Sequence, residues 1–177
     1  MRDHCVMSER DAVRGKVLVS VCAIIEGENH VILLLWEGDV PYHKLWVIPG
    51  GYIKPEETVK QAVVREVREE TRLEILPAKL VGVYDDSIPE KDELTHHIII
   101  AYEAIVVGGR IIIPHEAIEY AWTSVGEALN HPQIPDVFKK ILGDLKQRKV
   151  STLVSRLRRR SSCWQFIQSG RYVWEET

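Results

Sequence analysis

The chain has 177 residues, with 23 lysines and arginines against 26 aspartates and glutamates, for a formal net charge of −3 at pH 7. This length fits one domain with an appendage. The longest apolar runs are too short to span a membrane as helices, and the N-terminus lacks a secretory-signal pattern. Three widely spaced cysteines, without histidines at zinc spacing, favour reduced thiols in a cytoplasmic protein over a disulfide framework or a zinc site.

The expected elements are strands, one long helix, further strands and then C-terminal helices. A polar arm over 1–14 is followed by strands at 16–25 and 30–36, a helix over 58–73, and strands at 78–85, 95–107, 110–113 and 117–122. A charged loop is expected at 87–93, and a hairpin turn at Gly108-Gly109. Ser124 should cap a short helix through Leu129, and Pro135 should open a helix to about Lys149. This order predicts an α/β/α architecture.

The helix expected over 58–73 carries a dense group of carboxylates. Glu66, Glu69 and Glu70 stand at i, i+3 and i+4, so they share one helix face. Their mutual repulsion becomes favourable if they bind a hard cation such as Mg²⁺ or Mn²⁺. Arg65 can pair with Glu69 one turn later. Pro55, Glu56 and Glu57 should place negative charge at the helix start. The alternative is a solvated charged face without a ligand.

The segment before the helix adds a tight turn. Trp46-Val-Ile-Pro49-Gly50-Gly51 is an apolar strand end that runs into Pro-Gly, which suits a type II turn with Gly50 at positive φ. Such a turn directs backbone carbonyls outward, and a carbonyl oxygen is another ligand for a hard cation. The strand, turn, loop and carboxylate helix together predict a compact metal site.

The segment from Gly51 to Leu73 resembles the Nudix box. The residues in register are Gly51, Glu57, Arg65, Glu66, Val67, Glu69, Glu70 and Leu73, and one position departs, because Arg72 stands where the family has glycine. The resemblance extends over about 15–143, which implies a Nudix-type α/β/α sandwich with a mixed sheet. The expected organisation is therefore an arm (1–14), a Nudix domain (15–143) and a basic, aromatic extension (144–177).

The resemblance implies a hydrolase that cleaves a nucleoside diphosphate linked to another group, with Mg²⁺ or Mn²⁺ as cofactor. It makes Glu66, Glu69 and Glu70 metal ligands, with a box glutamate (Glu66 or Glu69) as one choice of general base. The carbonyl of Gly50 or Gly51 becomes a further ligand. Arg65 orients a carboxylate, and Glu57 ties the loop to the helix or acts as an outer ligand.

Some family members use a general base on a later loop, and here the candidates are Glu116 and Glu119, with a surface role as the alternative for either. Arg72 falls at the helix C-terminus, where a left-handed conformation costs a non-glycine residue about 1 kcal/mol. This departure affects the local turn and leaves the chemistry intact.

Four residues outside the box are candidate substrate contacts: Trp46, Asp85, Asp86 and His97. Trp46, like Trp36 and Trp122, could stack on a base or pack in the core. Asp85 and Asp86 end a strand near the expected substrate side. His96 and His97 are adjacent in a strand and face opposite sides, so they do not form a joint metal site.

The C-terminal region is strongly basic. Residues 139–160 hold nine lysines and arginines against one acid, Asp144. Val150, Leu153, Val154 and Leu157 recur at helical spacing, which predicts an amphipathic basic helix. This helix could pack on its own domain or on a homodimer partner, bind RNA phosphates, or contact anionic lipid. The aromatic segment 161–177 is expected to dock.

The sequence thus favours a pyrophosphohydrolase for a small nucleotide such as ADP-ribose, a nucleotide sugar or a (d)NTP. One alternative is an RNA 5′-end pyrophosphohydrolase that grips the strand with residues 139–160. Another is a non-catalytic nucleotide-sensing regulator with the same fold. The intact carboxylates Glu66, Glu69 and Glu70 argue against that regulator, because a pure sensor does not need them.

Overall fold

The computed structural model of the chain describes residues 15–27, 30–37, 42–90, 93–113 and 117–168. Within these residues the elements follow in the order β1 (Gly15–Gly27), β2 (His30–Trp36), β3 (Trp46–Val47), β4 (Gly50–Tyr52), α1 (Val59–Thr71), β5 (Leu73–Glu90), β6 (Glu93–Gly109), β7 (Ala117–Ser124), α2 (Val125–Asn130) and α3 (Asp136–Gln168).

The sheet is mixed, as expected, and β1 lies at its centre. β1 pairs in parallel with β6, from Gly15 opposite Leu94 to Ile25 opposite Ala104, and antiparallel with the short strand β4. β5 pairs with β6 along nearly its whole length. β2 continues from the far end of β1 and pairs antiparallel with β3 and β7. This arrangement brings β4, and the loop after it, against the middle of β1.

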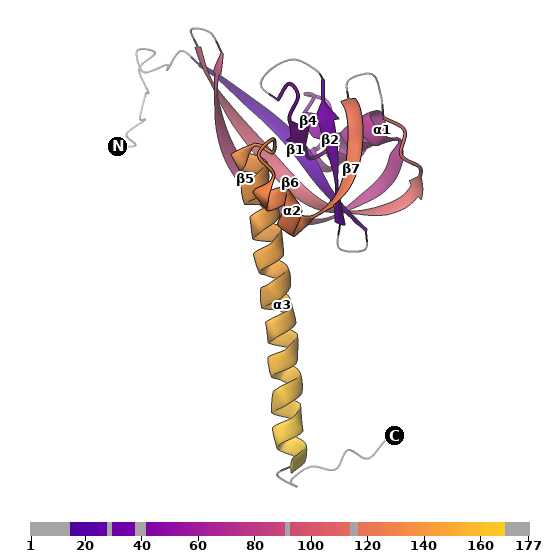
Figure 1. Cartoon of the computed structure of the whole chain (residues 1–177), viewed down its shortest axis with the longest axis vertical. Coiled ribbons are helices and arrows are strands. Elements are labelled where there is room, and N and C mark those ends of the chain that lie inside the picture. Colours follow the sequence, from indigo (N-terminus) through magenta and orange to yellow (C-terminus); the bar gives the residue numbers. More distant parts are fainter. Residues whose placement is uncertain (1–14, 28–29, 38–41, 91–92, 114–116, 169–177) are drawn as a thin grey trace, which may run out of the picture.

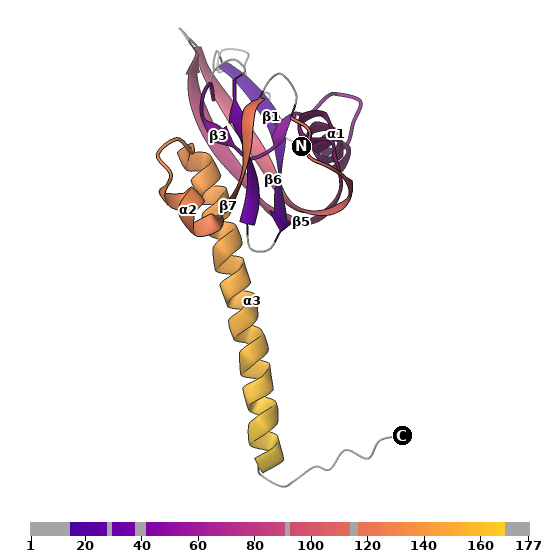
Figure 2. The same cartoon turned by 45° about the vertical axis from the view of Figure 1, so that its right-hand side comes forward.

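Helices cover the strands from two sides. α1 lies on one side, and α2 with the first part of α3 lies on the other (Figures 1 and 2). The α/β/α architecture expected from the order of elements is therefore confirmed. No helix in the described part of the chain combines the length and apolar character needed to cross a membrane.

The C-terminal helix is longer than expected. The sequence predicted a helix to about Lys149 and an amphipathic basic helix that includes Val150. In the structure α3 is continuous from Asp136 to Gln168 and projects well beyond the sheet (Figure 1). No proline interrupts this segment. The helix is attached to the body by polar contacts: Tyr84 donates to Asp144 at 3.0 Å, and Arg148 donates to the carbonyl of Leu80 at 2.9 Å.

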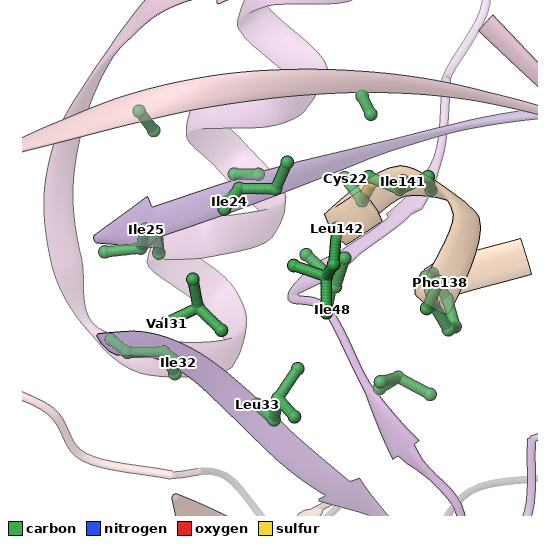
Figure 3. Close-up of a cluster of buried hydrophobic side chains, with 14 of the residues drawn as sticks. Cys22, Ile24, Ile25, Val31, Ile32, Leu33, Ile48, Phe138, Ile141 and Leu142 are labelled. Atoms are coloured by element: carbon green, nitrogen blue, oxygen red, sulfur yellow. The ribbon is translucent and has the colours of Figure 1, made fainter. Parts of the chain in front are cut away.

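The hydrophobic core lies where β1, β2 and the start of α3 meet. Five consecutive residues of β1, Val21 to Ile25, are buried, which explains why this strand reads as an unbroken apolar run. Ile141 and Leu142 of α3 approach the same region as Cys22 and Ile48 (Figure 3). The core therefore fixes α3 against the strands that carry the turn before α1.

The ends of α1 are defined by capping. Thr58 is the N-cap and forms a capping box with Gln61. Glu56 and Glu57 directly precede this cap, so the negative charge expected at the helix start lies next to the first turn and not within it. At the other end Arg72 adopts the left-handed conformation, with φ 60°. The helix thus ends where the family glycine stands, with an arginine in the backbone conformation that glycine favours.

Two expected loops and one expected strand are wrong. Gly108 and Gly109 do not form a hairpin turn but pair with Glu74 and Leu73 at the end of β6. Residues 110–113 are not a strand, because they run past the end of α1, where Ile112 donates to the carbonyl of Thr71 at 3.0 Å. The charged segment 87–93 is largely strand, since β5 continues to Glu90 and β6 begins at Glu93.

Candidate functional site

A cavity of about 650 Å³ opens between α1, β4, β1, β6 and the start of α3. Its lining is Ser20, Val21, Cys22, Trp36, Tyr42, Val47, Ile48, Gly50, Gly51, Tyr52, Lys54, Arg65, Glu66, Glu69, Glu70, His97, Ile99 and Phe138. Charged groups come from α1 and the loop before it, and aromatic groups come from other segments of the chain. A ligand of the cavity would therefore meet both a charged and an apolar, aromatic wall.

Arg65 organises the charged wall. Its Nε and Nη2 donate to the two carboxylate oxygens of Glu57, at 2.8 and 2.5 Å, and Nη2 also donates to the carbonyl of Tyr52 at 2.9 Å. Its Nη1 donates to Glu66 at 2.7 Å and to Glu69 at 3.0 Å. The ion pair expected between Arg65 and Glu69 is present, and the same guanidinium also joins the loop before α1 to the helix.

Gly50 and Gly51 allow close packing on β4, because Gly50 faces β1 and Gly51 faces α1. The Gly50 amide donates to Glu70 at 2.8 Å. A Cβ on Gly50 would lie 2.1 Å from the carbonyl oxygen of Val21, and one on Gly51 would lie 2.6 Å from the carboxylate of Glu66. The expected type II turn is wrong, because Gly109 is the positive-φ glycine among the described residues. Glycine is required at 50 and 51 for space, not for backbone conformation.

Burial and hydrogen bonding shift the pKa values of two glutamates, Glu57 and Glu66, in opposite directions. The hydrogen bonds from Arg65 lower the pKa of Glu57 to about 2. Burial raises the pKa of Glu66, although Arg65 opposes this effect. Glu70 is the most enclosed of the three helix carboxylates, with 6% of its surface exposed, while Glu69 is exposed.

The oxygen atoms in the charged wall of the cavity are of the kind that bind a hard divalent cation. Glu66, Glu69, Glu70 and the two glycines all line the same cavity, and they offer oxygen atoms, which Mg²⁺ and Mn²⁺ prefer. As they stand, no three acidic, histidine or cysteine side chains of the described residues are gathered as a ready ligand set. In this structure Glu66 and Glu69 accept hydrogen bonds from Arg65, and Glu70 accepts one from the Gly50 amide.

The aromatic wall comes from segments far apart in the sequence. The ring of Tyr42 lies 5.3 Å from that of Phe138 on α3, and its hydroxyl donates to Asp86 at 2.9 Å. Tyr52 lies 5.4 Å from His97, with the rings tilted by 36°. His97, a predicted substrate contact, lines the cavity. Asp86, another predicted contact, is not part of the lining but accepts the hydrogen bond of Tyr42, which is.

Other candidate residues lie away from the cavity lining. Trp46 packs edge-on against His131, Asp85 is exposed and binds His96, and Glu119 is exposed on β7. Glu116 lies outside the described residues. These positions leave the box glutamates as the candidate bases that line the cavity.

Sequence reasoning missed several residues of the cavity. They are Tyr42, Tyr52, Lys54 and Phe138, and Trp36 lines it where Trp46 had been preferred. Tyr52 and Lys54 lie just after Gly51, the glycine of the box. Their closeness to the box in the sequence could have identified them as cavity residues. Tyr42 and Phe138 carried no local signal, because they meet only through the packing of α3.

Comparison with known proteins places this geometry in a family. The family model described as NUDIX domain matches residues 16–143. An ADP-ribose pyrophosphatase of Methanocaldococcus jannaschii is 34% identical over 131 residues, which cover 74% of each chain. A CTP pyrophosphohydrolase of Escherichia coli is 29% identical over 120 residues, covering 68% of this chain and 85% of that protein.

Solved structures agree with the fold. The crystal structure of a MutT protein from Methanosarcina mazei superposes with a TM-score of 0.67 at 26% identity, and the match covers 78% of this chain and 99% of that one. The helix α3 beyond about residue 143 lies outside the segment that the family model matches.

Proposed function

Because the chain belongs to the Nudix hydrolase family, we propose that it cleaves the diphosphate of a small nucleotide, such as ADP-ribose, a nucleotide sugar or a (d)NTP, with the help of Mg²⁺ or Mn²⁺. The observation that carries this proposal is the cavity itself. Three helix carboxylates, Arg65 and Lys54 lie along one wall, and aromatic side chains lie along another. A molecule with a charged diphosphate and a flat base matches both.

The carboxylates Glu66, Glu69 and Glu70 would hold the cation, with the carbonyl of Gly50 or Gly51 as a further ligand. When bound, a divalent cation neutralises phosphate charge and acidifies coordinated water. Nudix hydrolases generally use such metals. Glu66 and Glu69 would have to turn from Arg65 toward the cavity, a small movement because both already line it.

The remaining charged residues position the reacting groups. Arg65 holds Glu57 by two hydrogen bonds, so the loop before α1 stays fixed when Glu66 and Glu69 turn away from the guanidinium. Lys54 lies in that loop and lines the cavity, where its ammonium group would attract the phosphates. A box glutamate, Glu66 or Glu69, would accept the proton of the attacking water, because both residues line the cavity that a diphosphate would occupy.

The substrate range of two relatives supports this class. One relative is named for ADP-ribose and another for CTP, so the common chemistry is the diphosphate and not the attached group. A cytoplasmic location, a homodimer and an RNA contact through residues 139–160 remain predictions.

The test is a panel of nucleotides with Mg²⁺ or Mn²⁺. ADP-ribose, UDP-glucose, the (d)NTPs and a 5′-triphosphorylated RNA are incubated with the protein, and the products are resolved by chromatography. The proposal expects a nucleoside monophosphate from at least one small nucleotide, and none when the metal is chelated. Hydrolysis of the RNA alone would overturn the small-nucleotide assignment, and no hydrolysis of any member would overturn the proposed function.

A further inference from the structure

The side chain of His97 is buried in the wall of the cavity. Only 4% of its surface is exposed, and among the described residues neither ring nitrogen has a hydrogen-bond partner. Buried polar groups are nearly always hydrogen-bonded, because an unmet donor or acceptor destabilises the fold. A buried imidazole that lines the cavity in this state is a site where a ligand could supply the missing partner.

The position of His97 separates it from the carboxylates. Gly50, whose amide binds Glu70, pairs with Cys22 of β1, whereas His97 of β6 pairs with Leu18. These β1 positions are four residues apart, which corresponds to about 13 Å along a strand at 3.3 Å per residue. The register therefore places His97 away from the Gly50 turn, so a ligand that reaches both must extend along the direction of β1.

The surroundings of His97 suit a flat, uncharged ring. Tyr52 packs against the imidazole, and Ile99, Trp36 and Phe138 contribute apolar surface to the same cavity. Burial lowers the pKa of His97, although the charge of Asp86 opposes this effect. A neutral imidazole has one donor and one acceptor nitrogen, so it matches a polar base edge, and it lacks the positive charge that would favour phosphate.

We propose that His97 is the specificity-determining residue of the site, which hydrogen-bonds the edge of the nucleobase while the diphosphate lies at Glu66, Glu69 and Glu70. The inference rests on the proposed function, because it names the part of the substrate that selects among nucleotides. The same cavity provides the contacts for both ends of the ligand.

The test compares His97→Phe with wild type on nucleotides that differ only in their base. Phenylalanine keeps a flat ring and removes both nitrogens, and the four NTPs and the matching nucleoside-diphosphate glucoses form the panel. Wild type should prefer at least one base, and the variant should lose about 10- to 100-fold in kcat/KM on it, the range that corresponds to an unmet buried partner. The loss should appear mainly as a higher KM, because this contact lies far from the reacting bond.

The adjacent histidine is a matched control. His96 points to the other side of β6, is partly exposed and binds Asp85. His96→Phe should leave the base preference within about twofold, a change of less than 0.5 kcal/mol. His97→Asn keeps a donor and an acceptor and should restore part of the preference. If His97→Phe does not fold, His97→Leu carries the same test.

A binding measurement separates this inference from the proposed function. Nucleoside monophosphates are titrated into wild type and His97→Phe by calorimetry, which requires no turnover. Base-selective binding that depends on His97 supports the inference even if the panel shows no hydrolysis. Hydrolysis or binding with the same base preference in wild type and His97→Phe overturns it. A wild type without any base preference also overturns it, since the imidazole would then select no base.

Discussion

Substituting Gly51 by alanine should displace the carboxylate of Glu66, which we propose as a metal ligand or base, and little else. A Cβ at this position would lie 2.6 Å from Cδ and Oε2 of Glu66 and 2.7 Å from Oε1. Ordinary contacts begin at 3.4 Å, so the carboxylate has to move, and a misplacement of about 1 Å at a reacting centre costs on the order of 100-fold in rate. Because the clash involves the end of a side chain and not backbone, the melting temperature should change by only about 3 °C.

Two other glycines supply the comparison for Gly51→Ala. Gly143→Ala in α3 meets only Leu129, at 3.9 Å, and should leave the hydrolysis rate unchanged while raising stability by about 0.5–1 kcal/mol, since alanine favours a helix interior. Gly50→Ala clashes with the backbone carbonyl of Val21 and should destabilise the whole fold.

The assay for the three glycine variants is the initial rate of nucleotide hydrolysis, combined with thermal unfolding of each protein. If Gly51→Ala keeps its rate within about threefold while remaining folded, the position of Glu66 does not govern catalysis. The tight approach of α1 to β4 would then have no part in placing a reacting group.

Three further predictions concern the helix end, the buried histidine and the extension. Arg72→Gly should raise the melting temperature by about 2–4 °C, because Arg72 holds φ 60° at a cost of about 1 kcal/mol, and a large loss of activity would instead identify Arg72 as a substrate contact. Burial lowers the pKa of His97 in the folded protein, although the charge of Asp86 opposes this effect. The unfolded chain therefore binds a proton at His97 more readily than the folded protein, and the free energy of unfolding should fall as pH drops below about 6.5. Chemical denaturation should show a smaller fall for His97→Phe, and an equal fall would contradict a buried neutral imidazole. Deleting 150–177 retains the contacts of Arg148 and Lys149 and should leave hydrolysis of a small nucleotide unchanged, whereas weaker RNA binding with a flatter salt dependence would assign the extension to RNA.

The sequence predicted features that depend on local pattern. The periodic apolar residues between Thr58 and Leu73, with no glycine or proline among them, placed α1 within two residues of its observed bounds. Ser124 correctly marked the start of α2. Apolar runs located β1 and β2 because both strands are buried on their two faces.

Features that depend on tertiary neighbours could not be predicted in the same way. Gly50 reads as a turn glycine, yet its role is set by the carbonyl of Val21 on a neighbouring strand. Tyr42 and Phe138 reach the cavity only because the core holds α3 against β1. The length of β5 was underestimated because its charged end, expected as a loop, pairs with β6.

The most direct test of the metal-assisted mechanism is the rate of nucleotide hydrolysis as a function of Mg²⁺ concentration in wild type and Glu66→Gln. The account predicts no hydrolysis after chelation, saturable activation by Mg²⁺, and a loss of at least about 100-fold in Glu66→Gln at an unchanged melting temperature, since a bound cation contributes several kcal/mol. Glu74→Gln, which changes an exposed glutamate of β5, is the matched control and should behave as wild type. A rate that survives chelation, or a folded Glu66→Gln with wild-type turnover, would contradict the assignment of this carboxylate face.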